Sequence, residues 1–201
     1  MPEWGPRLDR EFYLRDAREV AKDLLGMLLV RISPEGPTGG LIVETEAYLG
    51  PDDPGSHAAR GRTARNAAMW AIGGTAYVYR IYGIHHCLNV VTGPGGAPQA
   101  VLIRALEPRV GTELMRRRRG VERLIDLCSG PARLCQALDI DLRLNFADMV
   151  SGPLFIARPL PDDELLGFEI ATSTRIGLPP GRGDDLPLRF YVSGCPYVSK
   201  P

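Results

Sequence analysis

The chain has 201 residues, 44% of them hydrophobic and 24% charged, and its formal net charge at pH 7 is zero. Length and composition predict one compact globular domain over residues 1–201, with residues 1–8 flexible. No apolar run approaches the roughly 20 residues of a membrane span, and the start lacks a signal-peptide layout, which favours a cytoplasmic protein without membrane contact.

The predicted elements begin with a helix and a hairpin. Asp16 and Glu19 have the spacing of a capping box and Gly26 supplies a stop, so a helix is expected over residues 16–25. An apolar strand over residues 27–32 and the strand LIVETEAYLG over residues 41–50 flank a turn rich in proline and glycine. This arrangement predicts antiparallel pairing.

The strand over residues 41–50 holds candidate active-site residues. In an extended strand Glu44, Glu46 and Tyr48 share one side, and the residues between them share the other, core-like side. Two carboxylates and an aromatic ring would then line a pocket wall just before a polar loop. A half-solvated strand whose charges face water explains the same pattern, so the decapeptide alone leaves both interpretations open.

A short helix over residues 58–71 and a second hairpin are expected next. The hairpin turns tightly at Tyr82-Gly83, and alternation along its first strand favours a core position for Tyr77. Tyr82, presented on a turn, has the shape of a wedge that could enter a base stack. Asn89 lies in an apolar run of the return strand, where it is either a core hydrogen-bonding residue or a reader of a pocket.

Arg104 interrupts an almost wholly apolar strand over residues 100–106. Buried arginine is rarely unpaired, so Glu44 and Glu46 are its candidate partners. Helices are expected over residues 112–119 and 131–138, and strands over residues 154–157, 168–176 and 188–192. The whole pattern predicts a mixed α/β (α+β) fold, in which a curved antiparallel β-sheet is flanked by short helices.

The charges cancel overall but are unevenly distributed. Between Arg60 and Arg123, eleven basic residues stand against three acidic ones, a local balance of 11 − 3 = +8. We expect this segment to form a positive face suited to phosphates, with the four arginines at 116–119 mostly solvated or facing phosphate because they cannot all share one face of a helix.

Several chemistries lack a signal in the sequence. Cys87, Cys128, Cys135 and Cys195 form no C-x-x-C pair, which predicts small buried residues in a reducing compartment. The histidines form no H-x-x-x-H pair, and no phosphate-binding glycine motif or G-x-S-x-G elbow is present. We therefore expect neither a metal nor a cofactor.

Five runs of sequence together resemble the alkyladenine (3-methyladenine) DNA glycosylase family. In order they are VETEAYLGPDDPGSHAARGRTARN, AYVYRIYGIHHCLNVV, VLIRALEP, LCSGPARLCQAL and LRFYVSGCPYVS. The resemblance covers about residues 9–199. It implies a base-excision repair enzyme that acts on double-stranded DNA, flips out a damaged purine such as 3-methyladenine, 7-methylguanine or hypoxanthine, and hydrolyses its N-glycosidic bond.

The resemblance also implies roles for single residues. Glu46 matches the general base that deprotonates the attacking water, and Arg104 matches the neighbour that positions this water. Tyr48 and Tyr79 match the two aromatic rings that sandwich the flipped base.

Three further residues match the family's contacts with DNA and the base. His57 matches an additional base contact, Tyr82 the residue that fills the gap left in the duplex, and Asn89 the pocket residue that disfavours the exocyclic amine of guanine. Two stretches depart from the family pattern. Residues 70–74 stand in place of a proline-glycine turn and an aromatic, and His85-His86 in place of bulkier aromatics, which puts the substrate range in doubt.

Two other functions stay open from the sequence. A non-catalytic nucleic-acid-binding module would have the same basic face and tyrosines. A glycosylase with lyase activity would need an amine nucleophile, for which the nitrogen of Pro2 is the main candidate because Lys22 and Lys200 lie outside the matched motifs. We expect a monofunctional, monomeric enzyme, associated with the nucleoid if the source is bacterial.

Overall fold

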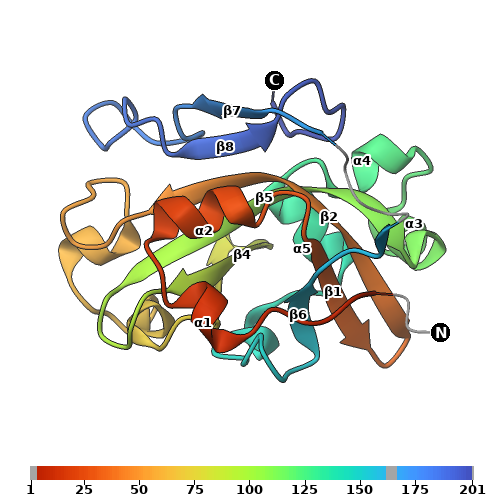
Figure 1. Ribbon diagram of the computed structural model, residues 1–201, viewed down its shortest axis with the longest axis horizontal. Helices are drawn as coiled ribbons and strands as arrows, with labels where there is room; N and C mark the ends of the chain where they lie inside the picture. Colours follow the sequence, from red (N-terminus) through yellow and green to blue (C-terminus); the bar gives the residue numbers. More distant parts are fainter. Residues whose placement is uncertain (1–3, 162–166, 201) are drawn as a thin grey trace.

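The computed structural model describes residues 4–161 and 167–200. In these residues an eight-stranded antiparallel sheet is surrounded by short helices (Figure 1). The strands are β1 (Leu28–Ser33), β2 (Gly36–Tyr48), β3 (Ala76–Ile81), β4 (His85–Thr92), β5 (Gln99–Val110), β6 (Leu154–Ala157), β7 (Ile170–Ser173) and β8 (Arg189–Val192). The α-helices are α1 (Arg10–Tyr13), α2 (Ala17–Asp23), α3 (Thr112–Arg119), α4 (Leu124–Cys128) and α5 (Pro131–Ala137). The 3₁₀-helices are η1 (His57–Arg60), η2 (Ala67–Trp70) and η3 (Leu142–Leu144).

The long strand β2 connects the parts of the sheet. Along one edge its first part pairs with β1 and its residues 44–46 pair with β8, while β5 pairs with both parts along the other edge. The path runs β3-β4-β5-β2-β1-β6, with β8 and then β7 attached beside β2. In Figure 1 the β7–β8 pair lies above the rest of the sheet. The curved antiparallel sheet and short helices confirm the predicted fold.

The register of β2 against β5 shifts between residues 42 and 45, in the part of β2 where β8 takes over from β1 as the neighbour on the other edge. Val43 has no opposite residue on β5, and one step further along Arg104 has no opposite residue on β2. Bulges of this kind bend a strand and redirect side chains. The irregularity therefore takes Arg104 out of the alternation of an otherwise apolar strand.

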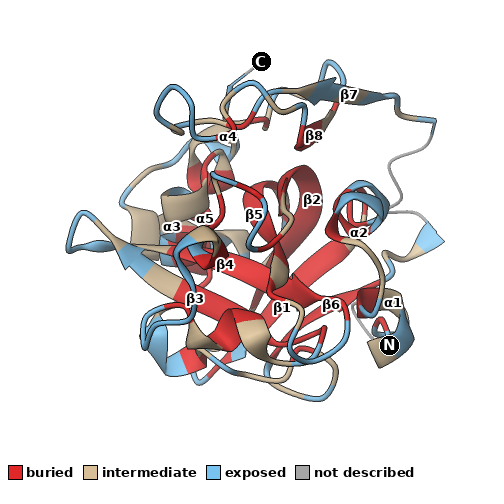
Figure 2. Ribbon diagram, turned by 90° about the vertical axis from the view of Figure 1, so that its left-hand side faces the viewer, coloured by how far each residue is buried: buried red, intermediate tan, exposed pale blue. Residues whose placement is uncertain are grey.

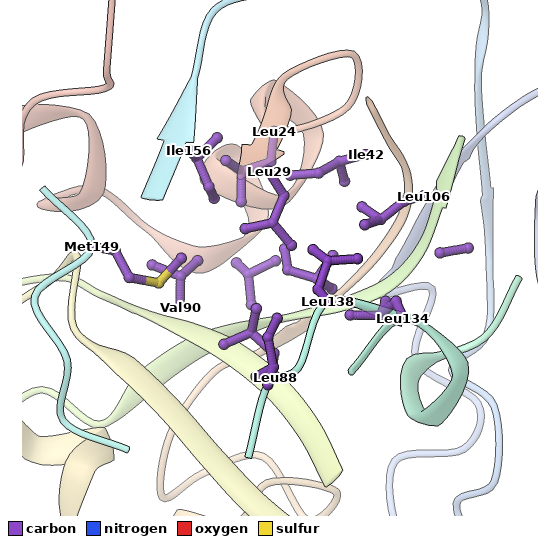
Figure 3. Packing of buried hydrophobic residues seen from close by; sticks show 14 of the residues in the cluster. Leu24, Leu29, Ile42, Leu88, Val90, Leu106, Leu134, Leu138, Met149 and Ile156 are labelled. Carbon is purple, nitrogen blue, oxygen red and sulfur yellow. The ribbon is translucent and has the colours of Figure 1, made fainter. Parts of the chain in front are cut away.

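The main core lies between the sheet and the helices α2 and α5 (Figure 3). This cluster includes Leu24 at the end of α2, Leu29 of β1, Leu88 of β4 and Leu134 of α5, and all four are fully buried. The red ribbon in Figure 2 shows that burial extends along most of the central strands. Asp16 caps helix α2, as its position predicted, and its carboxylate accepts a hydrogen bond from the amide of Arg18; the helix itself spans Ala17–Asp23 and is shorter than the predicted residues 16–25.

Residues 58–71 do not form the single helix that their alanines suggested. They hold the one-turn helices η1 and η2, and a loop stabilised by Asn66 connects them. The Asn66 amide donates to the carbonyl oxygens of His57 and Gly61, and its oxygen accepts from the amide of Thr63. Side-chain bonds to the backbone replace the helical ladder here, as they do for asparagine generally.

The start of the described chain is held against β6. The amide of Gly5 donates to the carbonyl of Arg158 at 3.0 Å, and the amide of Leu8 donates to the carbonyl of Ile156 at 2.9 Å. Flexibility was expected for residues 1–8; residues 4–8 have these contacts, and residues 1–3 lie outside the described residues.

Helix α3 has the predicted bounds, but most of its arginines bind the protein. Arg116 pairs with Glu113, the Arg118 guanidinium contacts Glu35 at 2.7 Å, and Arg119 donates to the carbonyl of Leu127 at 3.2 Å. The expectation that the four arginines are mostly solvated or facing phosphate is therefore wrong, since these three bind other groups of the protein.

All four cysteines are free thiols, and three of them are buried as predicted, while Cys195 is partly exposed. None of the helices in residues 4–161 and 167–200 is long and apolar enough to cross a membrane.

We predict that Leu29→Ala lowers the free energy of unfolding by about 2 to 5 kcal/mol, because it leaves a cavity in the main core. Leu142→Ala is the matched control, since Leu142 is 47% exposed, and it should change stability by less than about 0.5 kcal/mol. Urea unfolding of both variants checks this. Equal losses would show that the region around Leu29 is not the main core.

Candidate active site

A buried charge cluster joins strands β2 and β5. The Arg104 Nε lies 3.0 Å from Glu44 Oε1, and its Nη1 lies 3.2 Å from Glu46 Oε1. Both carboxylates are fully buried, and Arg104 is 6% exposed. The predicted pairing is confirmed, and the alternative that the charges of β2 face water is wrong.

The other face of β2 belongs to the core, as alternation predicted. Val43 and Ala47 are fully buried in the main hydrophobic cluster. Thr45 lies between them and donates its hydroxyl to the carbonyl of Ala21 on α2 at 2.8 Å. Because Val43, Thr45 and Ala47 pack into the core, the alternating residues Glu44, Glu46 and Tyr48 must lie on the opposite face of β2.

Glu46 is held by three donors. The Tyr48 hydroxyl donates to Glu46 Oε2 at 2.9 Å, and the amide of Ile176 donates to Glu46 Oε1 at 2.7 Å, beside the contact with Arg104. Burial raises the pKa of Glu46, and the charge of Arg104 and these two hydrogen bonds only partly oppose it. A carboxylate whose pKa is raised takes up a proton more readily, which is what a general base requires.

A cavity of about 320 Å³ lies over this cluster. Six residues that the sequence singled out line it, namely Tyr48, His57, Tyr79, Tyr82, Asn89 and Arg104. Glu46 lies beneath this lining, in contact with the lining residues Tyr48, Arg104 and Ile176. The structure therefore brings together all seven residues of the predicted site.

Aromatic rings from β3 and η1 form one wall of the cavity. The His57 and Tyr79 ring centroids are 4.6 Å apart, and those of Tyr77 and Tyr79 are 5.3 Å apart. The Tyr77 hydroxyl lies 2.8 Å from His57 Nδ1. Partial desolvation, and then the charge of Arg65, lower the pKa of His57, so the imidazole is neutral at neutral pH. Tyr77 is buried as predicted and also lines the cavity.

Asn89 is buried on β4 and has the partner that its position required. Its Nδ2 donates to the carbonyl oxygen of Tyr77 at 3.2 Å, and the residue lines the cavity. The two alternatives left by the sequence are therefore compatible, because Asn89 is hydrogen-bonded and belongs to the pocket wall.

Tyr82 occupies the tip of the β3–β4 hairpin, where the ribbon in Figure 2 is largely exposed. Its side chain is 91% exposed and its φ is +48°, and Gly83 follows with φ +74°. Positive φ at both central residues is typical of a tight hairpin turn, but it is uncommon for a bulky aromatic residue. Strain of this kind concentrates at functional sites.

Sequence reasoning missed a second buried ion pair. Arg175 Nη1 lies 2.6 Å from Asp53 Oδ2, and both side chains have almost no exposed surface. The guanidinium also stacks 4.7 Å from the centre of the Tyr48 ring, and Asp53 accepts from the amides of Leu49 and Gly55. The pair therefore supports Tyr48 and the loop that follows β2.

Glu44 has additional partners that were also missed. Arg189 Nε lies 2.7 Å from Glu44 Oε1, and the amide of Ser199 donates to Glu44 Oε2 at 2.7 Å. Arg189 lies in the apolar run LPLRFYV, so the rule that singled out Arg104 could also have found it. In the described part of the chain, no three His, Cys, Asp or Glu side chains are grouped to hold a metal ion.

Comparison with known proteins decides the family. A family model described as methylpurine-DNA glycosylase matches residues 11–196. The chain belongs to the methylpurine-DNA glycosylase family. It is 51% identical to a protein of Methanoculleus marisnigri and 49% identical to one of Carboxydothermus hydrogenoformans, in each case over 96% of this chain and 98% of the relative. A relative from Streptomyces avermitilis is 45% identical over 96% of this chain and 90% of its own length. All three have names that assign them provisionally to the 3-methyladenine DNA glycosylases.

Family membership confirms the resemblance inferred from the five sequence runs. A methylpurine-DNA glycosylase is a hydrolase of N-glycosyl bonds, and this chain is an enzyme of that class. The roles of its individual site residues stay predictions.

We predict that Arg104→Ala lowers the free energy of unfolding by about 3 to 5 kcal/mol, because it leaves two buried carboxylates without their shared cation. Arg104→Lys should restore part of this stability and less of the activity, since an ammonium lacks the planar fork. Arg109→Ala on the same strand is the control, because its pair with Glu107 is partly exposed and should contribute only about 0 to 1 kcal/mol. Thermal and urea unfolding test this, and wild-type stability of Arg104→Ala would contradict it.

Proposed function

We propose that this protein excises alkylated or deaminated purines, such as 3-methyladenine, 7-methylguanine and hypoxanthine, from double-stranded DNA as a monofunctional glycosylase. The observation that carries the proposal is the Glu46–Arg104 pair beneath a cavity walled by aromatic side chains. A volume of about 320 Å³ is at the lower end for ligand pockets and suits one planar base.

In the proposed reaction a water molecule attacks the sugar carbon C1′ of the flipped nucleotide. Glu46 accepts a proton from this water, and the electrons of the C1′–N bond leave with the base. The products are a free base and an abasic sugar. Arg104 contacts Glu46 and lines the cavity, so it can orient the water and the carboxylate together.

The state of the leaving base decides how much help it needs. An alkylated purine is cationic and is already a good leaving group, whereas neutral hypoxanthine needs protonation as well. Flipping costs a few kcal/mol and least for a damaged base, and stacking on an aromatic ring returns about 1 to 3 kcal/mol per base. Tyr48 and Tyr79 can together offset this cost.

Exposed arginines near the aromatic wall support a role in holding DNA. Arg60, Arg62, Arg65 and Arg80 are all exposed, and they lie on η1, the following loop and β3. Arg65 also donates to the carbonyl of Arg80 at 3.2 Å. In this proposal they bind backbone phosphates, which predicts an affinity for DNA that falls with increasing salt.

Two sequence alternatives are separated by simple assays. A non-catalytic binding module would bind DNA without releasing base. Lyase activity through Pro2, which lies outside the described residues, would let borohydride trap a covalent complex with DNA, and a monofunctional enzyme gives none. The monomeric state and a cytoplasmic or nucleoid location remain predictions.

We predict that Glu46→Gln lowers the single-turnover rate of hypoxanthine excision by roughly 10² to 10⁴, because the amide cannot accept the proton. Binding to lesion-containing duplex should persist. Glu122→Gln is the control, since its side chain is 92% exposed. Near-normal excision by Glu46→Gln would remove Glu46 from the mechanism.

A second prediction concerns Tyr82 as the wedge that fills the gap in the duplex. Tyr82→Ala should weaken binding to lesion-containing duplex because the flipped state loses its plug, whereas Tyr82→Phe should be mild. Fluorescence anisotropy on duplexes with and without one lesion measures both. Equal weakening by the two variants would mean that the hydroxyl matters and that the wedge interpretation is wrong.

A further inference from the structure

The segment that follows β8 contacts both Glu44 and Arg104 of the buried charge cluster through Ser199. The amide of Ser199 donates to Glu44 Oε2 at 2.7 Å, and its hydroxyl donates to Glu44 Oε1 at 3.0 Å. The same hydroxyl accepts from Arg104 Nη2 at 3.3 Å. A single side chain therefore bridges Glu44 and Arg104.

Strand β8 supports the same carboxylate through Arg189. This guanidinium lies 2.7 Å from Glu44 Oε1, donates to Ser173 Oγ on β7 at 3.0 Å, and donates to the carbonyl of Lys200. Two carboxylates and two guanidinium groups give the cluster no net formal charge, which favours its burial. The hydrogen bond from Arg189 to Lys200 thus holds the segment after β8 against β8 itself.

We propose that Ser199 is a positioning residue, which through Glu44 holds the Arg104 guanidinium in the orientation that serves Glu46. This inference rests on the proposed function of Glu46 and Arg104. Glu44 is fully buried and is not among the residues that line the cavity, so its effect on the reaction passes through Arg104. Ser199 is itself partly exposed, and its side chain is small enough to be changed without leaving a large cavity.

If Ser199 positions Arg104, changing Ser199 should alter the pH dependence of the reaction, which a purely structural role would leave unchanged. The charge of Arg104 keeps the pKa of Glu46 from rising further, so a loosened guanidinium should let that pKa rise. The other charged or titratable groups that face Glu46 come from three elements, namely Glu44 and Tyr48 on β2, Cys87 on β4, and Arg175 after β7. None of them is changed by a substitution at Ser199. Since the base must be ionised, the low-pH limb of the rate profile should move to higher pH.

The test is the pH dependence of single-turnover hypoxanthine excision by four proteins: wild type, Ser199→Ala, Ser199→Thr and the control Ser193→Ala in the exposed turn after β8. We expect the limb of Ser199→Ala to move up by about one pH unit, which is a tenfold lower rate below the limb. Ser199→Thr keeps the hydroxyl and should keep the wild-type limb, as should Ser193→Ala. Rate constants from single turnovers do not depend on the fraction of permanently inactive protein, and unfolding curves of the four proteins over the same pH range exclude reversible partial unfolding as the cause of a shift.

An unmoved limb in Ser199→Ala would overturn the proposal even if the variant melts earlier, because Ser199 would then only stabilise the fold. Equal shifts in Ser199→Ala and Ser199→Thr would also overturn it, since the hydroxyl would not be the positioning group. Failure of the proposed function looks different: wild type would then release no base, or Glu46→Gln would match wild type.

Discussion

The structure of the site depends on burying one guanidinium between two carboxylates. Moving any of these charges out of water alone costs several kcal/mol, so Arg104, Glu44 and Glu46 must be brought together with good geometry or not buried at all. The architecture around them provides this geometry. The bulge removes Arg104 from the alternation of β5, and the core on the opposite face of β2 fixes the two carboxylates.

The two carboxylates share Arg104 but differ in their other partners, and this difference fits the different roles proposed for them. Glu44 also accepts hydrogen bonds from Arg189 and Ser199, neither of which lines the cavity. Glu46 accepts from Tyr48 and Ile176, both of which line the cavity, and burial raises its pKa. The same residue type, two positions apart, therefore yields a structural acceptor and a candidate base.

The sequence allowed much of the fold and most of the candidate site to be predicted. Alternation in LIVETEAYLG placed the carboxylates on one face, and the rarity of unpaired buried arginine identified the partners of Arg104. The pair of Asp53 and Arg175 was not predictable in this way, because Arg175 follows the polar run TST and Asp53 lies in the polar loop after β2, so neither residue stands in an apolar run that would mark it as buried. The single helix predicted over the alanine-rich residues 58–71 is wrong, because helix propensity contributes little free energy compared with the hydrogen bonds that the Asn66 side chain makes to the backbone.

The contact between Glu44 and Ser199 spans 155 residues, and the ion pair of Glu44 with Arg189 spans 145. Contacts at such separation form slowly, because the loop between them must first lose its conformational freedom. We therefore expect the charged groups of the cluster to stay hydrated until the sheet has closed around them and to join the structure late. Loosening the cluster would then speed unfolding much more than it slows folding. The charge cluster of the candidate active site would in this sense also determine how slowly the folded protein unfolds.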